Sequence, residues 1–128
     1  MRLVIVGAGW VGLVSGTCFA EMGHQVTCLD IDRKKINALQ SGLVSIYEPG
    51  LEELIKRNLH AGRLFFTADS ALALSTAEIC IIAVDTPSQA NGGADMSQVE
   101  SAARSIGRHL NQDSIIAIKS TVPVGTSQ

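Results

Sequence analysis

The feature that most constrains this chain is a glycine-rich turn between a short apolar run and a helical pattern. Residues 3–6 (LVIV) lead directly into Gly7-Ala8-Gly9-Trp10-Val11-Gly12. In a strand–turn–helix context, the pattern GxGxxG is typical of folds that bind dinucleotides. The first glycine makes the turn, the second lets the backbone approach a pyrophosphate, and the third lets the helix pack on the strand. The alternative is that these glycines only form a tight turn.

Short apolar runs alternate with helical patterns along the chain. Runs at residues 26–29, 79–84 and 114–118 are rich in β-branched residues, and residues 64–66 are a shorter candidate. Continuous runs of this kind predict strands buried on both faces of a parallel sheet. Between them, apolar residues recur every three or four positions, which predicts helices with these apolar stripes: Val11, Val14, Cys18 and Met22; Ile36 and Leu39; Val99, Ala103, Ile106 and Leu110.

The order of these elements predicts the fold class. Strands alternating with helices imply right-handed crossovers and an α/β fold of the Rossmann type, a doubly wound, mainly parallel sheet with helices on both faces. We expect the strand order 3-2-1-4-5. Asp32 is a predicted helix N-cap, and residues 51–59 are a predicted extra helix after Pro49. The polar segment 86–94 follows a predicted strand at the sheet edge where such folds bind ligands.

An acidic residue lies where a dinucleotide site needs one. Asp30 follows the second predicted strand, eighteen residues after Gly12. A carboxylate there accepts hydrogen bonds from ribose hydroxyls and repels a 2′-phosphate, which favours NAD over NADP. The following Arg33, Lys34 and Lys35 complicate this choice because a nearby base accommodates that phosphate, although a solvated helix face also explains them.

The amino-acid composition limits the classes of protein to which this chain can belong. At 128 residues, with 46% hydrophobic and 17% charged residues, the chain is expected to fold as one domain with its own core. A formal net charge of −2 and only 4% aromatic residues argue against nucleic-acid binding. No apolar stretch approaches the roughly 20 residues of a membrane span. A soluble, cytoplasmic protein without membrane contact is therefore expected.

The cysteines give no sign of a metal or catalytic site. Cys18, Cys28 and Cys80 lack any CxxC pairing and lie in apolar surroundings, which predicts buried, reduced thiols. None has a neighbouring histidine to activate a thiolate. We therefore predict no metal site and no catalytic cysteine in these residues.

Five motifs in order resemble one family over the whole chain. They are GAGWVG, CLDID, IYEPGL at residues 46–51, VDTPS at residues 84–88 and KSTVPVGT at residues 119–126. Together they are similar to the N-terminal NAD-binding domain of the UDP-glucose/GDP-mannose dehydrogenase family, with IYEPGL and KSTVP closer to the UDP-glucose branch. The resemblance implies that the full-length enzyme oxidises a nucleotide sugar, with UDP-glucose converted to UDP-glucuronate for polysaccharide biosynthesis, and that it forms a homo-oligomer.

The resemblance also implies a set of NAD-binding residues. In family members the glycine turn holds the cofactor, an acid binds the adenosine ribose, a base five positions later contacts the adenosine side, and hydroxyl residues lie towards the nicotinamide. Thr121 also corresponds to a residue that helps to position water. From the residues alone, Thr86 is explained as a turn residue before Pro87. The hydroxyls of Ser120 and Thr121 are explained as hydrogen-bonding partners of the backbone at the end of the last strand. The implied set is Gly7, Gly9, Trp10, Val11, Gly12, Asp30, Lys35, Thr86, Ser120 and Thr121.

Two departures from the family pattern are visible. The residue before Thr86 is commonly glycine in the family and is Asp85 here, which raises a question about the local backbone. The catalytic Cys, Glu, Lys, Asn and Asp of the family lie beyond this domain, so we expect residues 1–128 to bind NAD(H) without oxidising a sugar nucleotide, whose binding needs the downstream domains. The alternative class is a free-standing nucleotide-sensing Rossmann module, which shares the glycine turn and the acid.

Overall fold

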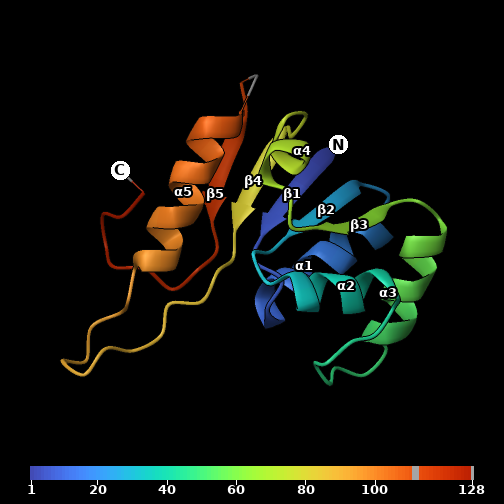
Figure 1. Ribbon diagram of the computed structural model, residues 1–128, viewed down its shortest axis with the longest axis horizontal. Coiled ribbons are helices and arrows are strands. Elements are labelled where there is room, and N and C mark those ends of the chain that lie inside the picture. The colour runs from blue at the N-terminus through green and yellow to red at the C-terminus, as the bar shows by residue number, and fades with distance from the viewer. Residues whose placement is uncertain (111–112, 128) are drawn as a thin grey trace.

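Parallel strands form one sheet in residues 1–110 and 113–127, the part of the chain that the computed structural model describes (Figure 1). The strand order is β3-β2-β1-β4-β5, and every neighbouring pair is parallel. This confirms the predicted doubly wound α/β fold and its strand order. The strands are β1 (Arg2–Val6), β2 (Gln25–Leu29), β3 (Leu64–Thr67), β4 (Ile79–Ile82) and β5 (Ile115–Ile118). Strand β4 ends before residues 83–84, which were predicted to continue it.

Helices cover both faces of this sheet (Figure 1). Helices α1, α2 and α3 share one hydrophobic cluster with the sheet, and α4 and α5 share another. The short helix α4 was not predicted, because five residues are too few to show a periodic pattern. The helices are α1 (Trp10–Glu21), α2 (Arg33–Gln40), α3 (Leu51–His60), α4 (Ser70–Leu74) and α5 (Ser97–His109).

The two predicted helix starts are confirmed. The Asp32 side chain accepts hydrogen bonds from the backbone N–H groups of Lys34 and Lys35, both at 3.1 Å, and so caps α2. Helix α3 begins at Leu51, where residues 51–59 were predicted to be helical, and it ends one residue later than predicted. These local signals are therefore reliable guides to where the chain turns into a helix.

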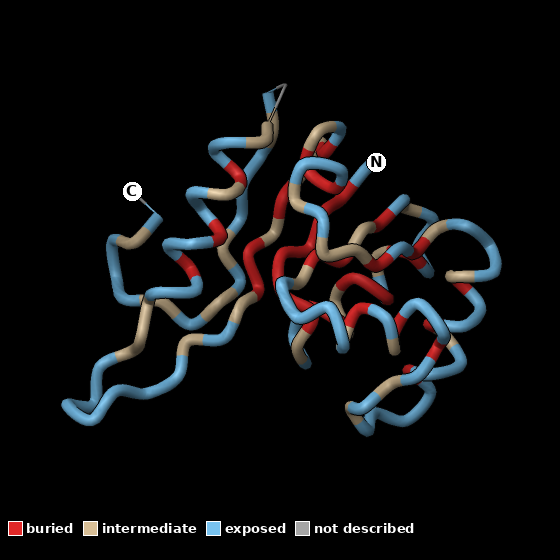
Figure 2. Tube along the Cα trace, viewed as in Figure 1, coloured by how far each residue is buried: buried red, intermediate tan, exposed pale blue. Residues whose placement is uncertain are grey.

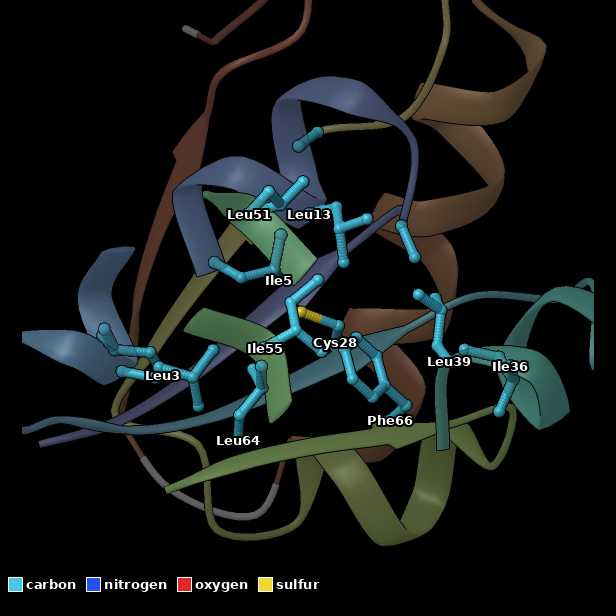
Figure 3. Packing of buried hydrophobic residues seen from close by; sticks show 14 residues of the cluster. Leu3, Ile5, Leu13, Cys28, Ile36, Leu39, Leu51, Ile55, Leu64 and Phe66 are labelled. Carbon is cyan, nitrogen blue, oxygen red and sulfur yellow. The ribbon is translucent and has the colours of Figure 1, made fainter. Parts of the chain in front are cut away.

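The core lies in two clusters because successive residues of a strand point to opposite faces. In β1, Leu3 and Ile5 enter the cluster under α1, α2 and α3, whereas Val4 and Val6 enter the cluster under α4 and α5. Figure 3 shows the first cluster, with Cys28 among the aliphatic and aromatic side chains that surround it. The helices are thus fixed on a sheet that is apolar on both sides.

The predicted apolar stripe of α1 is wrong. Val11 and Met22 are 43% and 72% exposed, and Cys18 is also exposed, so Cys18 is not the buried thiol that was predicted. The buried face instead consists of small residues and one leucine, because α1 lies so close to the sheet that little side-chain volume fits. Its buried residues are Gly12, Leu13, Gly16, Thr17 and Ala20.

Helix α5 and strand β5 also differ from the predictions. Helix α5 buries Val99, Ala102 and Ile106, whereas Ala103 is exposed, so the predicted stripe is displaced by one residue at that position. Strand β5 was predicted to be buried on both faces, but Ile115 is 65% exposed because β5 lies at the edge of the sheet. Figure 2 shows that buried residues concentrate in the middle of the sheet and become rare towards the C-terminus.

Candidate functional site

Two glycines of the turn are required by the packing of the protein itself. Gly7 has φ +109°, and a Cβ there would lie 2.7 Å from the carbonyl oxygen of Ala83. A Cβ at Gly12 would lie 1.8 Å from the carbonyl oxygen of Gly7. These contacts are far shorter than van der Waals distances, so only glycine lets α1 start immediately above β1.

The middle glycine is different. Gly9 is the N-cap of α1 with φ −78°, a conformation open to any residue, and the nearest atom to an added Cβ would be Asp85 Oδ1 at 3.6 Å. Within residues 1–110 and 113–127, no atom lies close enough to require glycine here, and no side chain caps the first N–H groups of α1. The predicted Trp10 and Val11 lie in this first turn, with both side chains exposed. The backbone therefore presents unpaired donors beside open space.

Asp30 joins the end of β2 to the glycine turn. Its Oδ2 accepts a hydrogen bond from the Ala8 N–H at 2.9 Å, and its Oδ1 accepts one from the Asp32 N–H at 2.9 Å. The Lys35 Nζ lies 3.6 Å from Oδ2, and the Asp30 side chain is only 13% exposed. The structure thus brings the predicted acid and base together, next to the glycines.

A cavity of about 530 Å³ opens at the carboxyl ends of β1, β2 and β4. Four of the predicted residues line it: Gly7, Gly9, Asp30 and Lys35. One wall is the polar face of α5, which was not among the predicted site residues. The spacing of serines every four residues was a usable signal for a polar helix face. The residues of α5 that line the cavity are Ser97, Gln98, Ser101, Ala102, Ser105 and Arg108.

The predicted hydroxyl residues do not line this cavity. The Ser120 hydroxyl donates a hydrogen bond to the carbonyl oxygen of Val84 at 2.7 Å, which ties the end of β5 to the end of β4. Thr86 is half-buried in the segment after β4, and Thr121 is exposed just beyond β5. These residues therefore lie on the side of β1 opposite to β2 and Asp30.

Asp85 does not strain the backbone. No residue other than glycine has a positive φ in the described ranges 1–110 and 113–127, so the position adopts a conformation that suits any residue. Aspartate in place of glycine at this position therefore changes the charge of the cavity and not the backbone conformation. The Asp85 side chain lines the cavity beside Gly9.

Cys28 and Cys80 are poor nucleophiles in this structure. Burial raises the pKa of the Cys28 thiol to about 12, with a smaller contribution from the nearby Asp30 charge. Burial also raises the pKa of Cys80. Both shifts disfavour the thiolate, which is the reactive form. Cys18, although exposed, lies on α1 away from the cavity lining.

The IYEPGL motif lies away from the glycine turn. Residues 44–50 form a second, open cavity of about 570 Å³ with Glu52, Glu53 and Lys56 of α3. The backbone carbonyl of Glu48 accepts a hydrogen bond from the Leu51 N–H at 3.1 Å, so its main chain helps to start α3. In the described residues, no three His, Cys, Asp or Glu side chains form a group that could hold a metal, and no helix is long and apolar enough to cross a membrane.

Comparison with known proteins gives a consistent result along the whole chain. A family model described as "UDP-glucose/GDP-mannose dehydrogenase family, NAD binding domain" matches residues 1–128. UDP-glucose 6-dehydrogenase TuaD of Bacillus subtilis is 50% identical over 127 residues, which are 99% of this chain and 28% of that protein. UDP-glucose 6-dehydrogenase of Pseudomonas aeruginosa is 50% identical over 128 residues, 100% of this chain and 28% of that protein.

Solved structures agree with the sequence comparison. GDP-mannose dehydrogenase of Pseudomonas aeruginosa, solved as a ternary complex, superposes with a TM-score of 0.94 at 36% identity over 98% of this chain and 30% of that one. The chain thus spans less than a third of the length of these relatives.

Proposed function

The chain belongs to the UDP-glucose/GDP-mannose dehydrogenase family as its NAD-binding domain, and from this premise we propose how its cavity holds NAD(H). The pyrophosphate lies on the glycine turn and the first turn of α1, and the adenosine ribose lies at Asp30. Residues 1–128 are then one Rossmann domain of a longer enzyme. Membership of this family favours a dehydrogenase over a free-standing nucleotide-sensing module.

The open space at Gly9 is the observation that carries this proposal. Gly7 and Gly12 are explained by internal packing, but Gly9 meets nothing closer than 3.6 Å and faces the cavity. A helix start with unpaired N–H groups and no acidic residue in its first turn favours an anion. A pyrophosphate fits this place because only a glycine lets the backbone approach it closely.

The other predicted residues take roles that follow from the strand order. Lys35, beside Asp30, contacts the adenosine side. Because β4 and β5 lie on the opposite side of β1 from β2, Thr86, Ser120 and Thr121 flank the nicotinamide half. The Ser120 hydroxyl donates its hydrogen bond to the Val84 carbonyl oxygen, which connects β5 to β4. Towards the cofactor, Ser120 therefore acts as a hydrogen-bond acceptor.

The activity that we propose belongs to the longer enzyme. NAD+, when bound, would supply the acceptor for each of two successive hydrides from C6 of UDP-glucose, and with one water the alcohol would become the carboxylate of UDP-glucuronate for polysaccharide biosynthesis. In this chain we assign no catalytic residue, and Thr121 supports the positioning of water. The nucleotide sugar needs the downstream domains, and the full-length enzyme is a cytoplasmic homo-oligomer. The 128 residues alone bind NAD(H) without turnover.

Titration calorimetry with the 128-residue protein tests the cofactor site. We expect NAD+ to bind more tightly than NADP+. We expect Gly9→Ala to lower the affinity for NAD+ by about ten- to a hundredfold, which corresponds to the free energy of about one charged hydrogen bond. The thermal midpoint of Gly9→Ala should stay near that of the wild type, because its Cβ meets no close atom. Gly107→Ala is the matched control, since Gly107 has nothing within 4 Å and lies outside the cavity. Unchanged binding by Gly9→Ala would contradict the proposed site.

A further inference from the structure

Asp85 places a negative charge in the cavity, whose lining also includes the cationic residues Lys35 and Arg108. Its Oδ1 would lie 3.6 Å from a Cβ on Gly9, at the place where the pyrophosphate is proposed to bind. The other carboxylate of the cavity, Asp30, is matched by two backbone N–H groups and by Lys35. None of the ion pairs within residues 1–110 and 113–127 includes Asp85. Its charge therefore acts directly on what enters the cavity.

The position of Asp85 assigns its charge to a particular part of a dinucleotide. It follows β4, on the opposite side of β1 from the ribose-binding Asp30. A dinucleotide that crosses the glycine turn from Asp30 thus brings its pyrophosphate and its nicotinamide half to Asp85. The two redox states differ in that half, because the pyridinium ring of NAD+ is cationic and the dihydronicotinamide of NADH is neutral.

We propose that Asp85 makes the cavity select the oxidised cofactor, holding NAD+ more tightly than NADH relative to a cavity without this charge. This inference rests on the proposed function. The carboxylate repels the pyrophosphate of both forms equally, but it attracts only the cationic ring. In a dehydrogenase, such a preference favours binding of the hydride acceptor and release of the reduced product. Asp85 is then a residue that determines cofactor specificity rather than a catalytic residue.

The size of the effect follows from Coulomb's law. Unit charges about 6 Å apart, at an effective dielectric constant of about 40 to 80, change an affinity by about three- to tenfold. Because the Asp85 side chain is exposed, added salt screens the interaction. The expected change is therefore in the ratio of the two dissociation constants, and it shrinks as salt is raised.

The test is calorimetric titration of the 128-residue protein with NAD+ and with NADH. In Asp85→Asn we expect affinity for NADH to rise by about three- to tenfold more than affinity for NAD+ at low ionic strength, and the difference to fall at about 1 M salt. Asp85→Glu keeps the charge and should retain the preference. Glu53→Gln is the matched control, because it removes one charge from an exposed residue that does not line this cavity.

The outcomes separate this inference from the proposed function. Binding of both cofactors with the same ratio of affinities in wild type and Asp85→Asn would overturn the role of Asp85 and leave the proposed function standing. An equal gain in affinity for both forms would overturn it too, because it would mean that Asp85 acts only on the pyrophosphate. If the wild type bound neither cofactor, the proposed function would fall and this inference with it.

Discussion

The carboxylate of Asp30 accepts a hydrogen bond from the backbone N–H of Ala8 at 2.9 Å, so the end of β2 holds the turn that follows β1. The same side chain bonds to the Asp32 N–H and lies near Lys35. Asp30 therefore shapes the glycine turn in addition to the ribose contact that we propose for it. Two substitutions separate these roles.

The first prediction compares Asp30→Ala with Asp30→Asn. Asp30→Ala removes the acceptor for Ala8, so it should lower the free energy of unfolding by about 1 to 3 kcal/mol and NAD+ affinity by about ten- to a hundredfold. Asp30→Asn keeps an oxygen for Ala8 but loses the charge, so it should retain more stability while discriminating less against NADP+. Urea unfolding and calorimetry with both cofactors measure these effects. A wild type that preferred NADP+ would show that Arg33 and Lys35, not Asp30, set the choice.

The second prediction concerns the close contact of α1 with β1. Because a Cβ at Gly12 would lie 1.8 Å from the Gly7 carbonyl oxygen, Gly12→Ala should destabilise the protein by at least about 1 to 3 kcal/mol. Gly107→Ala, on an open face of α5, should instead raise stability by about 0.5 to 1 kcal/mol. Urea unfolding curves of the two variants provide the comparison. Equal stability of the two variants would mean that the turn relaxes without cost.

The same contact explains why part of the fold was predictable and part was not. The strands, the Asp32 cap and the start of α3 could be predicted from the local sequence, because each depends on a few neighbouring residues. The buried face of α1 was mispredicted because apolar periodicity measures hydrophobicity, whereas the packing distance selected small residues such as Gly12 and Gly16. Volume constraints of this kind arise only when two elements meet.

The candidate site likewise consists of residues that could be predicted from the sequence and residues that could not. Gly7, Gly9 and Asp30 were identified because they belong to consecutive elements whose ends meet in any βαβ unit, whereas Lys35 was identified through the family resemblance. The wall from α5 comes from a segment some 70 residues later than Asp30, and its serines carry no motif. Its role depends on how α5 lies against the sheet, which the local pattern does not specify.

The third prediction concerns the accessibility of the thiols. Cys18 is exposed, whereas Cys28 and Cys80 are buried with raised pKa values. A thiol reagent should therefore label Cys18 rapidly in the folded protein and the other two only after unfolding. Cys18→Ser should remove the rapid phase and leave the slow phase. Rapid labelling of all three cysteines would contradict the packing of Cys28 between α1, α3 and the sheet.

The pKa of Cys28 also sets an alkaline limit to stability. Since the folded-state pKa lies near 12 and the ordinary value is 9.0, burial of the neutral thiol stabilises the fold fully below pH 9. This contribution is lost as pH rises through that interval, because the unfolded chain releases its proton first. Urea midpoints measured between about pH 8 and pH 10 should fall with increasing pH.

The fourth prediction concerns acid stability at the C-terminal end of α1. Glu21 accepts hydrogen bonds from Asn58 Nδ2 at 2.7 Å and from Arg57 Nη2 at 2.6 Å, both on α3. Asn58 is fully buried, and its Oδ1 accepts a bond from Arg63 Nε at 3.0 Å, just before β3. The Glu21 carboxylate therefore joins α1 to α3, and Asn58 extends this network to Arg63.

The hydrogen bond from Asn58, and then the one from Arg57, lowers the pKa of Glu21 below its ordinary value of 4.5. A lowered folded-state pKa gives stability that is present above pH 4.5 and lost as pH falls through the folded-state value. Glu21→Gln should therefore be less stable than the wild type at neutral pH and lose less stability on acidification. Glu52→Gln is the control, because its pair with Lys56 is exposed and contributes little. Urea unfolding across the acid range measures both, and equal acid sensitivity in wild type and Glu21→Gln would show that the α1–α3 junction does not depend on this charge.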